Sequence, residues 1–348
     1  MKCNSGNDIT AYIFFRGRWE VNIVSSICFQ YNYFTVVIDR NIYIRSLSLV
    51  NAMKGDQPGD LSIHDPVYDA GLPLLDVQSR LLLSAPWNVE KRRSSNIRIT
   101  PVAGYIEKQK KRDLKSTAYE AYATILFSHL FSRYNEMFSR NDFTLYVPQA
   151  VRVAHGERAE DNSLKSVLYE LFCPGRPFNR INNARSSDSC NVDGEEVRVG
   201  ERAMYLSGIF AEIMRREGLV HGDTSLRHFF MLPLDVKLND VDRDGNLYTL
   251  DSRNGLGVID VEGSRREGPD SEGVRKEVDA FHTRVSGRFR TPRSEEYFER
   301  GSALVKAKCL DFSAIDLVAR LADEIFASRF GNLGVARVDM REQKAYLR

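Results

Sequence analysis

The sequence contains few cysteines, and their spacing is not that of a metal site or a disulfide framework. Five cysteines are scattered through 348 residues: Cys3, Cys28, Cys173, Cys190 and Cys309. The number is odd and no Cys-x-x-Cys pair occurs, which argues against a disulfide-stapled fold and against a zinc knuckle. This pattern favours a reducing compartment.

Long apolar runs and an excess of one charge are also lacking. No run of about 18 apolar residues occurs, so no membrane-spanning helix is predicted. The polar first ten residues lack the apolar centre of a signal peptide. Lys and Arg (49) nearly balance Asp and Glu (47), and the net charge of +2 points to no nucleic-acid partner. We therefore expect a cytoplasmic enzyme or binding protein with no DNA partner.

Arginine is nevertheless clustered locally, in 91-KRRSSNIR-98, 264-SRR-266 and 284-RVSGRFRTPR-293. Such clusters are typical of a solvated surface, and contact with phosphate groups is the alternative.

The first part of the chain has the composition of β-strands. Aromatic and β-branched residues dominate 9–50, and strand patterns return in 79–84, 97–108, 143–147 and 164–172. Residues 54–76 are rich in Gly, Pro and Asp and are predicted to form a linker or irregular loop. One long helix is predicted over about 114–140, where apolar residues recur at helical spacing.

The second part is mostly helical. Residues 198–218 predict a helix that stops at Gly218, and 313–331 predict another with Ser313 at its cap and Gly331 at its end. The polar, Ser/Asn-rich stretch 182–196 predicts a mobile loop or insertion.

Two acidic motifs follow apolar strands in this second part. In 219-LVHGDTSLRHFFML-232, a strand runs into His221-Gly-Asp223, and His228 follows five residues after the Asp. In 256-LGVIDVEGSRR-266, a strand ends in Asp260, with Glu262 two residues later. If the two strands pair, Asp223, His228 and Asp260 meet at one end of a small sheet, where they suit a divalent cation and a phosphate.

This pair of motifs resembles the catalytic and metal-binding loops of the protein-kinase-like superfamily. The likeness is to its atypical branches: lipopolysaccharide core kinases, aminoglycoside and choline phosphotransferases, and the small kinase of the tRNA threonylcarbamoyl complex. The resemblance implies that Asp223 orients the acceptor hydroxyl and accepts its proton, that His221 braces the turn, and that Asp260 binds magnesium. It gives His228 and Glu262 as further metal ligands.

The same resemblance assigns a nucleotide site upstream. Lys108, with Lys110 as the alternative, and Glu120 are expected to pair over the ATP phosphates, and Glu170 to Phe172 are expected to form the hinge strand that meets adenine. In 274-VRKEVDAF-281, Asp279 is the candidate anchor of a helix that braces the catalytic loop.

Two departures from the family pattern leave alternatives open. His228 stands where Asn is usual, and no G-x-G-x-x-G precedes Lys108. A pseudokinase scaffold that binds nucleotide without transfer is therefore the alternative to an active enzyme, although both acids are retained. A hydrolase is disfavoured because no G-x-S-x-G elbow occurs.

The stretch 240-DVDRDGNLYTLD-251 approaches the register of an EF-hand calcium loop, with acids at Asp240, Asp242, Asp244 and Asp251. Its flanks are not amphipathic helices. An Asp-Gly turn in a β-hairpin is the favoured interpretation.

The sequence therefore predicts an α+β, two-lobed, protein-kinase-like fold. The expected parts are a β-rich extension or cap over 1–75, an N-lobe over 76–172 with one long helix, and a mostly helical C-lobe over 173–348. The expected activity is transfer of the γ-phosphoryl group of ATP, with Mg2+, to the hydroxyl of a small alcohol or sugar, a lipid-linked sugar, or a protein Ser/Thr. The N-terminal region is a candidate surface for a protein partner.

Overall fold

The computed structural model describes thirteen stretches of the chain: 11–16, 20–25, 66–72, 97–100, 105–110, 114–138, 143–157, 164–181, 189–192, 194–234, 236–252, 254–309 and 313–347. The chain divides into two compact units, Met1–Ser62 and Ile63–Arg348. In the first unit, β1 (Ala11–Arg16) and β2 (Glu20–Ser25) form an antiparallel hairpin, as their composition predicts. The strands predicted elsewhere in 26–50 and in 79–84 lie outside the described residues.

The second unit contains a five-stranded antiparallel sheet. Its order is β3 (Pro66–Gly71), β7 (Ala150–Glu157), β8 (Leu164–Leu171), β5 (Tyr105–Lys110) and β4 (Ile97–Thr100). The prediction of an irregular loop over 54–76 is wrong for β3. Pro66 lacks an N–H, but this is tolerated because it opens a strand at the edge of the sheet.

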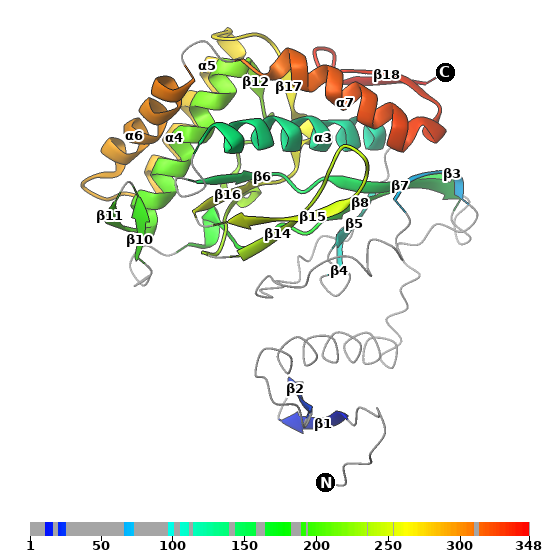
Figure 1. Cartoon of the computed structure of the whole chain (residues 1–348), viewed down its shortest axis with the longest axis horizontal. Helices are drawn as coiled ribbons and strands as arrows, with labels where there is room; N and C mark the ends of the chain where they lie inside the picture. Colours follow the sequence, from blue (N-terminus) through cyan, green and yellow to red (C-terminus); the bar gives the residue numbers. More distant parts are fainter. Residues whose placement is uncertain are drawn as a thin grey trace. The chain divides into compact units, whose positions relative to one another are not determined.

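Helix α3 (Leu114–Met137) follows β5 and is the long helix that the sequence predicts. It is buried on most sides, because the strands β6 (Thr144–Tyr146) and β7 contact it from one side and helix α7 (Ile315–Phe330) from the other (Figure 1). A helix that is apolar around most of its circumference requires such a position. Residues of α3 thereby reach both the large sheet and the C-terminal part of the chain.

A smaller sheet brings the two acidic motifs together. Its order is β6, β16 (Gly255–Val258), β13 (Phe229–Met231) and β9 (Arg176–Pro177). The strand after the His221 turn, β13, pairs antiparallel with the strand before Asp260, β16, with Phe229 opposite Val258. The pairing on which the sequence argument depends is therefore present. A two-residue ladder between β12 (Leu219–Val220) and β17 (Arg265–Arg266) joins the same motifs on their outer sides.

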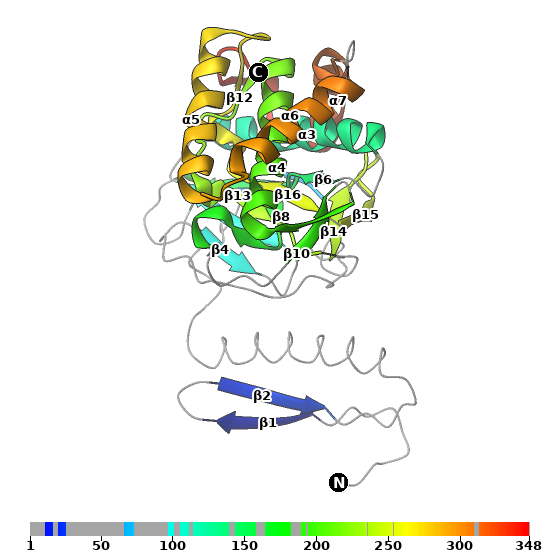
Figure 2. The same cartoon turned by 90° about the vertical axis from the view of Figure 1, so that its left-hand side faces the viewer.

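Helices α4 (Val199–Glu217), α5 (Glu272–Arg288) and α6 (Ser294–Lys308) pack together, with α4 against both of the others (Figure 2). Helix α4 ends at Gly218 in the left-handed conformation (φ 65°), as predicted. Short 3-10 turns connect the elements: η3 (Phe178–Arg180), η4 (Leu226–His228), η5 (Val261–Gly263) and η6 (Gly331–Leu333).

Three further predictions need correction. Part of the expected loop 182–196 forms a hairpin, β10 (Ser189–Val192) with β11 (Glu195–Arg198). Helix α7 begins at Ile315 with Ala314 at its cap, because the Ser313 hydroxyl instead donates to Glu217. A C-terminal hairpin, β18 (Val335–Asp339) with β19 (Lys344–Leu347), follows α7 and was not expected. The fold is α+β, and in the part of the chain that the structure describes no helix is long and apolar enough to cross a bilayer.

The acidic stretch 240–251 forms a hairpin, β14 (Val236–Val241) with β15 (Leu247–Ser252), as the Asp-Gly turn predicts. Asp240 is buried and accepts hydrogen bonds from Gln149 Nε2 (2.9 Å), Tyr248 Oη (3.1 Å) and Ser128 Oγ of α3 (3.3 Å). Asp251 is exposed and pairs with Lys237. These acids diverge, so their arrangement is not that of a calcium loop.

Burial raises the pKa of Asp240 from 3.8 to about 6 despite these hydrogen bonds. Because the folded pKa lies above the unfolded one, the folded protein binds the extra proton, and stability falls as pH rises from about 4 to about 6. The difference in pKa corresponds to about 3 kcal/mol.

We expect Asp240→Asn to flatten the pH dependence of the unfolding free energy between about pH 4 and pH 6 in denaturant titrations. Asp251→Asn, at an exposed position of the same hairpin, should retain the slope; equal slopes for both variants would contradict the assignment.

Candidate active site

Lys108 of β5 lies at the centre of a buried charge cluster. Its Nζ is 2.6 Å from Glu170 Oε2 on β8, 3.1 Å from Glu120 Oε1 on α3 and 3.9 Å from Asp260 Oδ1. Burial alone would lower the pKa of Lys108, but the charges of Glu170, Glu120 and Asp260 outweigh it and raise the pKa. The lysine is therefore held as a cation by three elements that are distant in sequence.

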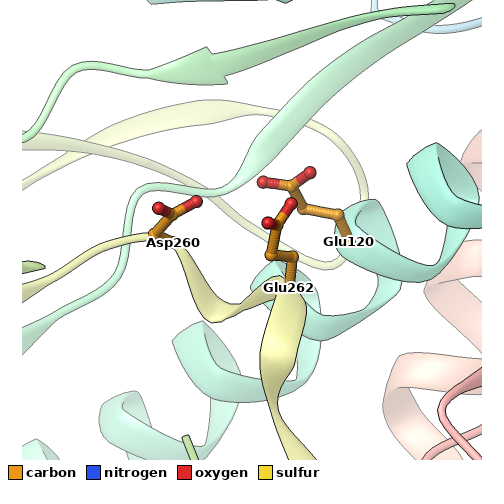
Figure 3. Close-up of side chains that lie close together, drawn as sticks. All are labelled: Glu120, Asp260 and Glu262. Atoms are coloured by element: carbon orange, nitrogen blue, oxygen red, sulfur yellow. The ribbon is translucent and has the colours of Figure 1, made fainter. Parts of the chain in front are cut away.

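Glu120, Asp260 and Glu262 bring their carboxylates together, with ligand atoms within 4.8 Å of one another. Figure 3 shows these side chains pointing toward a common point from α3 and from the turn at η5. Glu120 is fully buried, whereas the Asp260 side chain is 30% exposed, so the cluster opens toward solvent on one side. Three hard oxygen donors are the set that Mg2+ prefers, and the residues fit that ion.

The turn that carries Asp260 has an unusual backbone. Asp260 adopts a left-handed conformation (φ 63°), which is uncommon outside glycine. Gly222 in the facing turn also has positive φ (87°), and a Cβ there would lie 2.2 Å from the carbonyl oxygen of Gly263. The two motifs thus approach backbone to backbone, which only glycine allows at position 222.

His228 links the two acids of the motifs. Its Nδ1 is 3.6 Å from Asp223 Oδ2 and 3.2 Å from the Asp223 carbonyl oxygen, while its Nε2 is 3.2 Å from Asp260 Oδ2. Nε2 also accepts from Arg227 Nε (2.8 Å). Asp223 and Asp260 are therefore placed on either side of one buried imidazole. His228 borders the cluster of Glu120, Asp260 and Glu262 at Asp260, and its expected role as a metal ligand stays a prediction.

His221 is fully buried behind the turn. Its Nε2 lies 3.2 Å from the carbonyl oxygen of Ile259, and its carbonyl oxygen accepts from Ser264 Oγ (3.2 Å). Burial, together with the neighbouring His228, lowers the pKa of His221 to about 4, so the ring is neutral at physiological pH.

The carboxylate that braces this turn is Glu277 of α5. It accepts from the backbone N–H groups of His221 and Gly222, the latter at 2.9 Å. Asp279, the anchor suggested by the sequence, is exposed on the same helix. The sequence therefore identified the correct helix, α5, but the wrong residue, Asp279. Positions two apart on a helix point in different directions, so only one of them faces the His221 turn.

Sequence reasoning also missed a set of contacts that hold the segment after Asp260. The carbonyl oxygen of Ser264 accepts from Tyr119 Oη of α3, and the carbonyl oxygens of Gly263 and Ser264 accept from Gln343 Nε2 at the tip of the C-terminal hairpin. Gln343 itself has positive φ (54°). Nothing in the local sequence signals these contacts, because their partners are 79 to 145 residues apart.

The expected hinge residues lie on β8 and just after it. The Glu170 side chain turns inward to Lys108, and Phe172 is half-buried at the end of the strand. The side chain of Lys110, the alternative to Lys108, lies outside the described part of the structure. Residues 73–96, which precede β4, also lie outside it.

No family model matches this chain, and no curated protein matches it. Among solved structures, WaaP in complex with acyl carrier protein is similar at 15% identity and a TM-score of 0.31, over 64% of this chain and 80% of that one. The Rio2 kinase–ADP/Mg2+–phosphoaspartate complex from Chaetomium thermophilum matches at 13% identity and a TM-score of 0.25, over 62% and 56%. The aerobactin synthetase IucC from Klebsiella pneumoniae matches at 8% and 0.30, over 63% and 45%. Because these TM-scores are low, the function is inferred from the side-chain geometry and not from the similarity to these structures.

We expect Glu277→Gln to loosen the His221 turn, because an amide offers one acceptor oxygen where the carboxylate offers two. Charge-assisted hydrogen bonds of this kind contribute about 1.5–3 kcal/mol each. Hydrogen exchange followed by mass spectrometry should show faster exchange in peptides that cover 219–224. Asp279→Asn is the matched control on the same helix. If peptides covering 219–224 exchange equally fast in Asp279→Asn and in Glu277→Gln, Glu277 does not brace the turn.

Proposed function

We propose that the protein is an ATP-dependent phosphotransferase with a two-lobed, protein-kinase-like arrangement, and that it transfers the γ-phosphoryl group to a hydroxyl acceptor. The observation that carries this proposal is the convergence of Lys108, Glu120 and Asp260 at one point, with Asp223 and Asp260 on either side of His228. Phosphoryl transfer requires a cation for the phosphates, a carboxylate that can bind the metal and an accessible carboxylate for the acceptor hydroxyl.

On the donor side, Lys108 would bind the α- and β-phosphates. Its buried ammonium is held as a cation by Glu170, Glu120 and Asp260. Asp260 and Glu262, with Glu120 behind them, would hold Mg2+, which when bound neutralises charge on the phosphate oxygens. Glu170 to Phe172 would offer backbone groups to adenine at the end of β8.

On the acceptor side, Asp223 is the candidate base. Its side chain is 47% exposed, so an acceptor can reach it, and its Oδ1 accepts from the backbone N–H of Ser225 (3.0 Å), which fixes its orientation. Asp223 would accept the proton of the acceptor hydroxyl as its oxygen bonds to the γ-phosphorus and the bond to the β–γ bridging oxygen breaks. Positioning and charge neutralisation would supply the rate enhancement, without a covalent enzyme intermediate.

Three acceptor classes suit this chemistry: a small alcohol or sugar, a lipid-linked sugar, and a protein Ser/Thr. The acid two positions after Asp260 favours a non-protein acceptor. A protein partner for the N-terminal region stays a prediction.

We expect Asp223→Asn to lower acceptor-dependent ADP formation about 100-fold or more, because a positioned base contributes this much, while leaving Mg-ATP binding within about twofold. Coupled-enzyme ADP assays and calorimetry measure the two quantities, with Asp279→Asn as the control. Unchanged turnover would refute the role of Asp223. Wild-type protein that binds Mg-ATP but forms no ADP with any acceptor class would instead support a pseudokinase scaffold.

We expect Asp260→Ala to abolish the thermal stabilisation that Mg-ATP gives, because it removes a cluster carboxylate and a partner of Lys108. Differential scanning fluorimetry with ATP, with and without Mg2+, checks this. Asp244→Ala, at an exposed turn, should keep the full shift. A magnesium-dependent shift that survives in Asp260→Ala counts against the metal assignment.

A further inference from the structure

Acidic and basic side chains meet around the buried ring of His228. Glu120, Glu170, Asp260 and Glu262 gather on the Lys108 side. Two arginines reach the turn at Asp223 from different elements, Arg227 from η4 and Arg284 from α5. Arg227 spans the ring, because its Nε donates to His228 Nε2, the nitrogen that faces Asp260. The sequence cluster 284–293 thus begins at the mouth of the candidate site.

Arg227 lies next to the candidate base without neutralising it tightly. Its Nη2 is 3.4 Å from Asp223 Oδ2, a single long contact, and its side chain is 60% exposed. An exposed pair of this geometry contributes little to stability. The guanidinium is therefore positioned where an acceptor must approach Asp223.

Arg284 is directed at the same turn by the periodicity of α5. Glu277, which binds the backbone of His221 and Gly222, stands seven residues before it, two helical turns away on the same face. Arg284 Nη1 donates to the hydroxyl of Thr224, the residue after Asp223. Within the described residues, Arg284 has no carboxylate in ion-pair distance, whereas Arg215, Arg265 and Arg293 each pair with at least one.

A hydroxyl does not neutralise a guanidinium, so the charge of Arg284 beside the buried Thr224 is balanced only by the more distant carboxylate of Glu277 among the described residues. Guanidinium groups bind phosphate oxygens in a planar, two-point geometry. Arg284 contacts the residue after Asp223 and, among the described residues, forms no ion pair with the acids around Lys108, so an anion at Arg284 belongs to the acceptor and not to the Mg-nucleotide.

We propose that Arg284, with Arg227, binds a phosphate monoester on a small hydroxyl acceptor and so places its hydroxyl at Asp223. This inference rests on the proposed function, since it names the class of acceptor for that site. Arg284 acts as a specificity-determining residue, and acceptors that lack the anionic group bind more weakly.

The test is calorimetric titration of the full-length protein with glycerol 3-phosphate, and with glycerol as its uncharged counterpart, in the presence and absence of Mg-ADP. We expect glycerol 3-phosphate to bind and glycerol not to bind. Arg284→Gln should weaken glycerol 3-phosphate at least about tenfold, the effect of losing a charge-assisted contact. Arg284→Lys should restore part of the affinity, because lysine keeps the positive charge but lacks the planar, two-point geometry of the guanidinium.

Arg275→Gln is the matched control, since it removes the same charge from an exposed position of α5. Arg275→Gln should change the affinity for glycerol 3-phosphate by no more than about twofold, because solvent and salt screen the charge of an exposed side chain. The proposal is overturned if glycerol 3-phosphate does not bind, if Arg284→Gln and Arg275→Gln behave alike, or if Arg284→Gln weakens Mg-ADP as much as the phosphate ester. Phosphate binding that depends on Arg284 in a protein with no affinity for Mg-ADP or Mg-ATP would refute the phosphotransferase and leave the anion site standing.

Discussion

A single buried ammonium group organises this molecule. Lys108 Nζ lies within 4 Å of carboxylates from α3, β8 and the turn after β16. A buried cation without partners is strongly unfavourable, and removing one partner of such a pair costs about 3–5 kcal/mol. The large sheet, the long helix and the small sheet must therefore meet with these side chains in register, and the candidate site is the place where they meet. The same charge that requires compensation in the folded protein is the one that would bind nucleotide phosphates.

The turn at Asp260 is held in an uncommon conformation by contacts from three directions. Gly222 admits the backbone of Gly263, Tyr119 binds the carbonyl oxygen of Ser264 from α3, and Gln343 binds the same segment from the C-terminal hairpin. Left-handed residues outside glycine persist where surrounding structure determines them, and they concentrate at functional sites. The segment that follows Asp260 is thus tied on both sides within the described structure, which fixes the direction of the Asp260 and Glu262 side chains.

Helix α3 is anchored equally firmly at its other end. Buried Glu217, at the end of α4, accepts from Tyr134 of α3 and from the backbone N–H groups of Ala314 and Ile315 at the start of α7. Tyr122 Oη, two residues after Glu120, donates to Asp323 of α7 (2.9 Å). These bonds connect α3 to the residues that directly precede the His221 turn. The positions of Glu120 and of the candidate catalytic turn are consequently set by one connected group of side chains.

The local features could be predicted from the amino-acid sequence. They are the helices at α3, α4 and α7, the paired strands around the two acidic motifs, the Asp-Gly hairpin, and the order of Lys108, Glu120, Asp223 and Asp260 along the chain. These follow from periodicity, caps and turn chemistry, which act over a few residues. Only the tertiary structure decided which acids converge. It placed Glu120 beside Glu262 and set His228 between Asp223 and Asp260. It also chose Glu277 over Asp279, and brought Gln343 and Arg284 to the site. Such contacts join residues tens to hundreds of positions apart, and their partners are fixed by packing and by the compensation of buried charge, neither of which leaves a local signal in the chain.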